Sequence, residues 1–546
     1  MPQNRTAGWL ARAVDRVQSK LVGLEPARHR YTVERGLEVS TRDGAVLATD
    51  HYAPVGDALG TVLVRSPYGR GVPESLFHGR MLAGRGYHVV VQSVRGTGGS
   101  TGQFRPITQE ASDAQDAVAW LRAQPWFDGR LATLGGSYLG WTQWALLRDP
   151  PPELRACVVL VGPHDFARAV RGGGALALAD FLGWSAAVEA QGAGGFRGLR
   201  EMVAARRRTA AALSRPSSAA DAAAAALNGR GAWFSEWLAH EDLQDPFWDS
   251  YRATSVLAGV TVPTLLIGGW RDVFLDQTLE QYAALSAHNS EVGLTVGPWT
   301  HLDTAVKAAK VADAEALAWF GCHLGKTGAR RDSKVRVYVT GAGEWRSLPS
   351  WPPETVDWTL YPSADGSLPE TRAEGPGESR LVEFHYDPAD PTPAAGGHHM
   401  SPGAGSVDNR ELEARADVIT FTSAPLPADV EVFGPARLHL ALPGHHAGNG
   451  VFVRVCDVDT RGRSWNISEV FRRSGSATAA TDGVAELDLE TSPCAHRFRA
   501  GHRIRLQVSG GAYPRYDRNP DAAGYLVDCD LSALHLPIAG TAGMVN

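Results

Sequence analysis

A serine that follows a short apolar run and two glycines is the residue of this chain best suited to nucleophilic chemistry. Residues 131–134 have the character of a buried strand and residues 138–147 that of a helix start, with Gly135, Gly136 and Ser137 between them. A serine on such a tight turn is held in a strained conformation, with its hydroxyl close to helix N–H groups that can stabilise an oxyanion. The stretch predicts a nucleophile elbow.

The elbow departs by one place from the usual G-x-S-x-G pattern. Leu139 stands where the second glycine is expected, and the glycine follows at Gly140. A glycine-rich turn with a serine helix cap at Ser137 would show the same residues. A catalytic role for the serine therefore depends on finding a base and an acid at the same sheet edge.

An acid and a base follow Ser137 in the order that doubly wound hydrolases use. A serine hydroxyl needs a base to accept its proton, and the base needs a carboxylate to orient it. Asp272 and His301 each come just after an apolar run with strand character. Because parallel strands end at one edge of a sheet, the sequence predicts a Ser137, Asp272, His301 triad. Asp276 is a second candidate for the acid.

The elements that must position these residues alternate between apolar strands and helices. Stretches with strand character lie at residues 61–64, 87–91, 131–134, 262–267 and 292–296. Helical stretches lie between them at 76–83 and 113–121. This alternation predicts a parallel sheet covered on both faces. The alanine-rich residues 161–255 interrupt it and are predicted to form an inserted helical cap.

The last third of the chain has a different period. Apolar and polar residues alternate at 335–339, 358–361, 436–441, 451–456 and 504–508. This pattern predicts an antiparallel sandwich, with the Pro- and Gly-rich residues 387–405 as a long surface connection.

The fold class is therefore α/β: an α/β-hydrolase fold with an inserted helical cap and a C-terminal β-sandwich (jelly-roll) domain. The expected units are an N-terminal amphipathic helix at 1–26, a discontinuous hydrolase domain at 27–160 and 256–330, the cap at 161–255, and the sandwich at 331–546. We expect the N-terminal helix to dock on the protein's own core, with a membrane surface or a partner as the alternative.

Composition narrows the classes of partner. The 546 residues are 44% hydrophobic and carry a net charge of −6, with basic residues scattered, which argues against nucleic acid. No apolar run has the length of a membrane span, and the five cysteines form no C-x-x-C pair. We therefore expect free thiols and a cytoplasmic protein.

No cofactor is expected. No metal site is expected either, because the side chains of the adjacent histidines at 398–399 and 445–446 diverge. Homo-oligomer formation stays open.

Several motifs in order resemble the cocaine-esterase and X-prolyl dipeptidyl-peptidase (CocE/NonD) family of serine hydrolases. They lie at residues 94–102, 125–130, 135–144, 269–272, 297–301, 498–504 and 513–519. In that family the second elbow glycine stands one step later, as Gly140 does here. The resemblance covers about residues 37–534.

The resemblance implies a role for each matching residue. Ser137 would be the nucleophile, His301 the base and Asp272 its partner. The backbone N–H of Tyr138 and the hydroxyl of Tyr68 would form the oxyanion hole. One departure is Gln92, which lies in a segment where the family usually carries an acidic residue, and we expect it to affect a supporting contact.

The favoured function is hydrolysis of acyl esters, or of amides, through an acyl-enzyme on Ser137. An X-Pro dipeptidyl aminopeptidase or an α-amino-acid ester hydrolase is the alternative, and either must hold a substrate ammonium with paired carboxylates. Candidate acids in the cap are Asp165, Asp180, Glu189, Glu201, Glu236, Glu241, Asp242 and Asp245. Without a convincing acidic cluster, the sequence favours an uncharged acyl ester. A carbohydrate-binding jelly-roll protein with an inactive hydrolase domain is the non-enzyme alternative.

Overall fold

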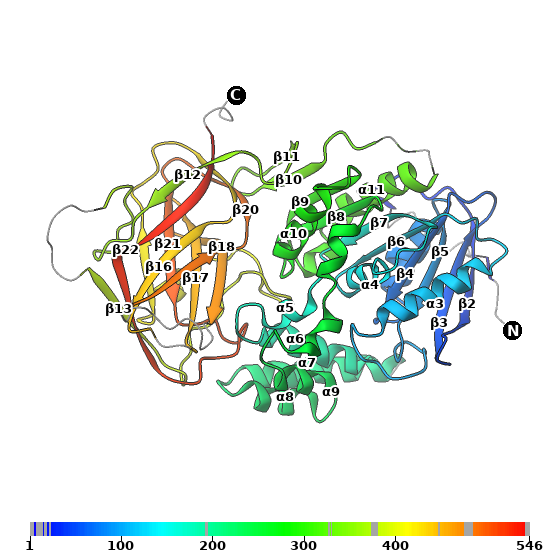
Figure 1. Ribbon diagram of the computed structural model, residues 1–546, viewed down its shortest axis with the longest axis horizontal. Coiled ribbons are helices and arrows are strands. Elements are labelled where there is room, and N and C mark those ends of the chain that lie inside the picture. The colour runs from blue at the N-terminus through cyan, green and yellow to red at the C-terminus, as the bar shows by residue number, and fades with distance from the viewer. Residues whose placement is uncertain are drawn as a thin grey trace.

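The computed structural model consists of a sheet-and-helix body beside an all-β body, with a group of helices below the first (Figure 1). It describes residues 5–6, 15, 19–20, 23–191, 195–325, 328, 330–372, 380–445, 448–473 and 484–540. The α/β fold class with a β-sandwich is confirmed.

The first body is built on an 11-stranded sheet with the order β1-β2-β3-β5-β4-β6-β7-β8-β9-β10-β11. Neighbouring strands from β5 through β10 run parallel, and the strands at both ends are antiparallel. The strand bounds are β1 Arg5–Thr6, β2 Tyr31–Ser40, β3 Val46–Pro54, β4 Thr61–Ser66, β5 His88–Ser93, β6 Leu131–Gly136, β7 Leu154–Leu160, β8 Thr264–Arg271, β9 Val292–Thr300, β10 Val335–Val339 and β11 Glu344–Leu348. Every residue of β4 and β8 is buried, as expected for parallel strands covered on both faces.

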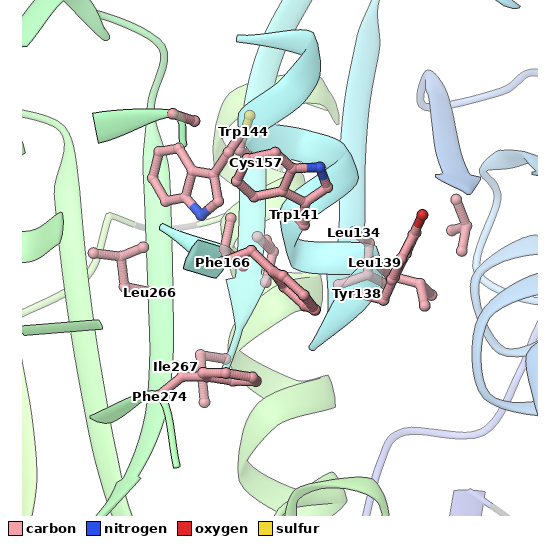
Figure 2. Close-up of a cluster of buried hydrophobic side chains, with 14 of the residues drawn as sticks. Leu134, Tyr138, Leu139, Trp141, Trp144, Cys157, Phe166, Leu266, Ile267 and Phe274 are labelled. Carbon is pink, nitrogen blue, oxygen red and sulfur yellow. The ribbon is translucent and has the colours of Figure 1, made fainter. Parts of the chain in front are cut away.

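Helices connect these strands. Their bounds are η1 Ser75–Arg80, α2 Met81–Ala83, α3 Glu110–Arg122, α4 Tyr138–Leu146, α10 Leu275–Ser286, η4 Leu302–Ala305, α11 Ala309–Phe320 and η5 Gly321–Gly325. The helix that follows the elbow, α4, is buried along its whole length and contacts β4, β6 and β7. Its Trp141 and Trp144 belong to one apolar cluster with Leu134, Leu139 and Phe166 (Figure 2). The elbow therefore rests on a densely packed support.

The chain between β7 and β8 is helical. It contains α5 Phe166–Arg171, α6 Leu178–Ala190, α7 Gly195–Leu213, α8 Ala219–Leu227, α9 Ala232–Ala239, η2 Pro246–Tyr251 and η3 Thr254–Gly259. Helices α6 to α9 lie at the lower edge of the first body in Figure 1. Aromatic side chains from α5, α6, α9 and η2 pack together, with Trp237 contacting Phe166, Phe181 and Tyr251.

The second body consists of two antiparallel sheets. One has seven strands, β19-β16-β22-β15-β20 with β12 and β13 also paired to β22, and the other has four, β14-β21-β17-β18. The bounds are β12 Thr355–Leu360, β13 Leu381–Tyr386, α12 Arg410–Glu413, β14 Val418–Thr422, β15 Val430–Gly434, β16 Arg437–Pro443, β17 Gly450–Val458, β18 Ser464–Arg473, β19 Val484–Glu490, β20 Cys494–Phe498, β21 Arg503–Ser509 and β22 Ala523–Ala539. Apolar side chains from both sheets, such as Leu440 and Val453, share one core.

One local prediction is wrong and another holds only in part. Residues 335–339 were expected in the sandwich, but β10 pairs in parallel with β9 and so extends the first sheet. Residues 387–405 were expected at the surface, and Asp387, Asp390 and Pro393 are exposed. His398 and His399, however, are only 4% and 9% exposed. Gly397 allows this burial, because a side chain there would collide with the carboxylate of Glu469.

The predicted N-terminal helix lies mostly outside the described residues. Arg5–Thr6 pairs with β2 as a strand, while Asp15 and two further residues are helical. Asp15 accepts a hydrogen bond from the Tyr31 hydroxyl at 2.9 Å and pairs with Arg80 at 2.8 Å. This part of the segment is therefore docked on the protein's own body.

Candidate active site

The elbow has the backbone geometry that the sequence predicts. Ser137 directly follows β6 and adopts a φ of 57°, a region that costs free energy for a residue with a side chain. Its N–H donates to the carbonyl of Leu160 at 2.9 Å, and its own carbonyl accepts from Gly140 and Trp141 at 2.8 and 3.1 Å. Backbone hydrogen bonds on both sides of Ser137 thus hold the turn.

The position of the second glycine has a steric cause. A Cβ on Gly140 would lie 2.6 Å from the Cα of Gly162, so α4 passes the chain after β7 at backbone contact distance. A Cβ on Gly135 would overlap Leu139, the residue before Gly140, which packs against the turn. Leu139 therefore occupies the usual glycine position without blocking the elbow. The glycine is needed at 140, where α4 lies against the backbone of Gly162.

The three predicted side chains meet at the carboxyl edge of the sheet. Asp272 directly follows β8 and His301 directly follows β9. The Nε2 atom of His301 lies 3.0 Å from the Oγ of Ser137, and its Nδ1 lies 2.6 Å from the Oδ1 of Asp272. The Asp272 side chain is fully buried, and its Oδ2 accepts from the N–H of Phe274 at 3.0 Å. This arrangement can pass a proton from the hydroxyl to the imidazole.

The second candidate acid points elsewhere. Asp276 lies in the first turn of α10 and accepts from the hydroxyl of Ser492 in the sandwich at 3.3 Å. Of the two carboxylates, the structure pairs His301 with Asp272.

The two predicted oxyanion donors lie on either side of the serine. Tyr138 is the first residue of α4, where a backbone N–H has no acceptor within the helix. Tyr68 follows β4 at the same sheet edge, and its hydroxyl lies near enough to Ser137 for the two side chains to interact. Burial raises the pKa of Tyr68 to about 12, so its hydroxyl stays protonated at neutral pH. Both groups could donate to an oxygen that develops negative charge beside Ser137.

A buried polar network holds the first residue of α4, next to the elbow, in place. The hydroxyl of Tyr138 donates to the Oε1 of Glu110 at 2.7 Å and accepts from the N–H of Ile107 at 2.9 Å. Glu110 also pairs with Arg65 at 2.9 Å. Gln92, at the departure from the family pattern, accepts from the Nε of Arg65 at 3.0 Å, so it belongs to this supporting network and not to the triad.

Sequence reasoning missed Trp184, a residue of α6 in the cap. Its Nε1 donates to the Tyr68 hydroxyl at 3.1 Å, and its ring stacks on Tyr138 at a centroid distance of 6.0 Å. The only signal in the sequence is an aromatic residue within an apolar helix, and this signal does not indicate where the N–H points.

The sandwich also reaches the site. Arg271, next to the buried acid, donates to the carbonyl of Asn466 in β18 at 3.1 Å. The N–H of Met400, from the tract that was expected at the surface, donates to Asp180 of the cap at 2.7 Å. Both bodies and the cap therefore contribute to the surroundings of the triad.

Most candidate acids of the cap serve local contacts. Asp165, Glu189, Asp242 and Asp245 accept backbone N–H groups at 2.9, 3.0, 2.8 and 2.8 Å, and Glu241 lies 3.8 Å from Arg171. Glu236 is exposed on α9, and Glu201 lies on α7. Asp180 differs, because its charge interacts with both Asp272 and His301, and burial raises its pKa to about 6. Arg515 of the sandwich also acts on Asp180 and favours its charged form.

The described residues provide neither a metal-binding cluster nor a membrane-spanning helix. Within the described ranges, no group of three or more His, Cys, Asp or Glu side chains could hold a metal ion. No helix in the same part of the chain is long and apolar enough to cross a bilayer.

Comparison with known proteins agrees with this geometry. The model of the X-Pro dipeptidyl-peptidase (S15) family matches residues 43–303, and that of the X-Pro dipeptidyl-peptidase C-terminal non-catalytic domain matches residues 327–537. Cocaine esterase of Rhodococcus sp. (strain MB1 Bresler) is 30% identical over 553 residues, which cover 91% of this chain and 94% of that protein. This chain belongs to the S15 family of serine hydrolases.

Solved structures share the fold. An α-amino acid ester hydrolase superposes with a TM-score of 0.80 at 22% identity, over 93% of this chain and 97% of that one. An aminopeptidase from a marine sediment archaeon (Thaumarchaeota) superposes with a TM-score of 0.79 at 23% identity, over 93% and 96%. The predicted family and the predicted serine-hydrolase activity are confirmed.

Proposed function

We propose that this S15-family enzyme cleaves acyl esters through an acyl-enzyme on Ser137. The observation that carries the proposal is the unbroken line from Ser137 Oγ to His301 Nε2 at 3.0 Å and from His301 Nδ1 to Asp272 Oδ1 at 2.6 Å. In this arrangement Asp272 fixes the tautomer of His301 and stabilises the imidazolium that forms.

The reaction proceeds in two halves. His301 accepts the proton of Ser137 while Oγ bonds to the carbonyl carbon, and the carbonyl oxygen becomes an oxyanion held by the N–H of Tyr138 and the hydroxyl of Tyr68. The C–O bond to the alcohol then breaks, and His301 gives the proton to the leaving oxygen. A water molecule, deprotonated by His301, attacks the acyl-enzyme in the same way and releases the acid.

An uncharged acyl group fits the surroundings best. A substrate ammonium in a desolvated pocket needs paired carboxylates. In the described part of the cap, the acid whose charge acts on the triad is Asp180, and the guanidinium of Arg515 already acts on it. Trp184 and Phe274 add apolar surface near the nucleophile, with the Phe274 ring 5.3 Å from that of His301. The relation to an enzyme named cocaine esterase also supports an ester over an amide.

The thiols support a reducing compartment such as the cytoplasm. All five cysteines are free, and burial raises the pKa of Cys157, Cys456, Cys494 and Cys529 to about 12.

The test compares two substrates on the parent enzyme and then measures one variant, Ser137→Ala. The purified enzyme is expected to hydrolyse p-nitrophenyl acyl esters with a higher kcat/KM than Gly-Pro p-nitroanilide. Ser137→Ala should abolish turnover while its circular dichroism spectrum and melting temperature stay those of the parent. A preference for the anilide would favour the dipeptidyl-peptidase alternative, and full ester activity in Ser137→Ala would refute the acyl-enzyme.

A further inference from the structure

The hydroxyl of Tyr68 receives a hydrogen bond from the cap. Trp184 of α6 places its Nε1 atom 3.1 Å from the Tyr68 oxygen. An indole N–H can only donate, so the tyrosine oxygen must be the acceptor in this contact. The one proton of the Tyr68 hydroxyl is thereby left for another partner.

The protons around Ser137 can be assigned in the same way. The Asp272 carboxylate only accepts, so Nδ1 of His301 carries its proton toward Asp272 and Nε2 is the acceptor for the Ser137 hydroxyl. Because the serine proton is used on that side, the Ser137 oxygen can meet the nearby Tyr68 hydroxyl only as an acceptor. The bond from Trp184 to Tyr68 and the bonds from Ser137 through His301 to Asp272 therefore leave the Tyr68 proton available on the side of Ser137.

Packing fixes the direction of the indole N–H. The ring of Trp184 lies nearly parallel to Tyr138, with 13° between the planes, and at 25° to Trp237, with centroids 6.0 and 6.3 Å apart. Phe104 and Trp233 contact the same ring from the loop before α3 and from α9. An aromatic ring held by several rings cannot rotate without displacing them, so its N–H stays aimed at Tyr68.

We propose that Trp184 is a positioning residue that makes Tyr68 a directed oxyanion donor. By occupying the acceptor side of the hydroxyl, it keeps the Tyr68 proton aimed at the reacting oxygen. By donating to the hydroxyl, it also strengthens the bond that Tyr68 donates in turn. The inference rests on the proposed function, because it requires Tyr68 to stabilise the oxyanion. It adds that the cap, through one indole nitrogen, controls that stabilisation.

A double-mutant cycle tests the proposal. Tyr68→Phe should lower kcat for a p-nitrophenyl acyl ester by about 100- to 1,000-fold, as expected for loss of one oxyanion donor. Trp184→Phe, which removes the N–H and keeps an aromatic ring, should lower kcat by about three- to tenfold, the effect of one hydrogen bond. In the Tyr68→Phe background, Trp184→Phe should have no further effect on kcat, because no hydroxyl remains to be directed.

A matched control is available in the cap. The Nε1 atom of Trp248 in η2 donates to the carbonyl of His240 at 3.2 Å, and its ring contacts Phe247 and Tyr251. Trp248→Phe removes the same atoms from a buried tryptophan that is not among the rings that hold Trp184, so we expect a kcat within about twofold of the parent. Replacement of Trp184 by benzothienylalanine keeps the indole shape without the N–H, and it should reproduce the kcat loss if the phenylalanine variant fails to fold.

The outcomes separate the inference from the function. Equal kcat losses from Trp184→Phe in the parent enzyme and in the Tyr68→Phe background would overturn the inference, because the indole would then act independently of the hydroxyl. A change confined to KM would overturn it as well. An undiminished kcat in Tyr68→Phe would instead refute the oxyanion role of Tyr68 in the proposed function, whatever Trp184→Phe does.

Discussion

Substitution of Gly140 tests the steric account of the shifted glycine. In Gly140→Ala the new Cβ would lie 2.6 Å from the Cα of Gly162 and 3.2 Å from the Cγ1 of Val159. The first of these neighbours is backbone between β7 and the cap, so it cannot swing away as a side chain could. Overpacking of this kind costs about 1–3 kcal/mol.

A displacement of α4 in Gly140→Ala should also lower the catalytic rate. Gly140 accompanies Tyr138 in the first turn of α4, so a shifted helix moves the N–H of Tyr138 and the hydroxyl of Ser137 relative to His301. A misplacement of about 1 Å can cost about 100-fold in rate. We therefore expect Gly140→Ala to lower both the melting temperature and kcat for a p-nitrophenyl acyl ester.

Gly183→Ala is the matched control. Gly183 lies inside α6, and a Cβ built there has no atom within 4 Å. Alanine is favoured over glycine in a helix by about 0.8–1.0 kcal/mol, so this variant should melt at a higher temperature than the parent. Equal melting temperatures and equal kcat for Gly140→Ala and the parent would refute the reasoning.

Three further predictions concern other parts of the molecule. Asp272→Asn should lower kcat by about 10,000-fold, the effect of a wrong imidazole tautomer in related triads, whereas Asp276→Asn should stay within about twofold of the parent; the reverse ranking would contradict the assignment of the acid. Burial raises the pKa of Asp180 from 3.8 to about 6. The folded state thus holds an extra proton between these values, and stability is lost as pH rises through them. Asp180→Asn, which keeps an acceptor for Met400, should therefore raise the melting temperature more at pH 8 than at pH 4.5, and an equal gain at both would be contrary evidence. Iodoacetamide at pH 8 should label the partly exposed Cys322 before the four buried thiols, as followed by peptide mass spectrometry; earlier labelling of a buried thiol would speak against the packing.

The sequence predicts the candidate triad because its members obey a topological rule. Ser137, Asp272 and His301 each directly follow a parallel strand, so pattern alone places them at one edge. Choosing between Asp272 and Asp276 needs the structure, because Asp276 lies in the first turn of α10 and its carboxylate accepts from Ser492.

Contacts that depend on helix orientation lie outside what patterns show. Trp184 sits 47 residues beyond Ser137 in the cap, and its contact with Tyr68 depends on how α6 packs against the sheet. Alternation of apolar and polar residues also fits two places for residues 335–339, since a strand near the edge of a parallel sheet can have the period of a sandwich strand. His398 is buried beside Glu469 of β18, and Met400 donates to Asp180 of the cap; both partners are distant in sequence, so no local pattern reveals these contacts.

The central claim is that the hydroxyl of Ser137 is activated by His301. A fluorophosphonate probe, followed by digestion and peptide mass spectrometry, measures this directly because the probe reacts with activated serines. We predict one stoichiometric adduct on the peptide that contains Ser137, and its loss in His301→Ala. An unmodified Ser137 in the active parent enzyme, or an adduct on another serine, would contradict the account.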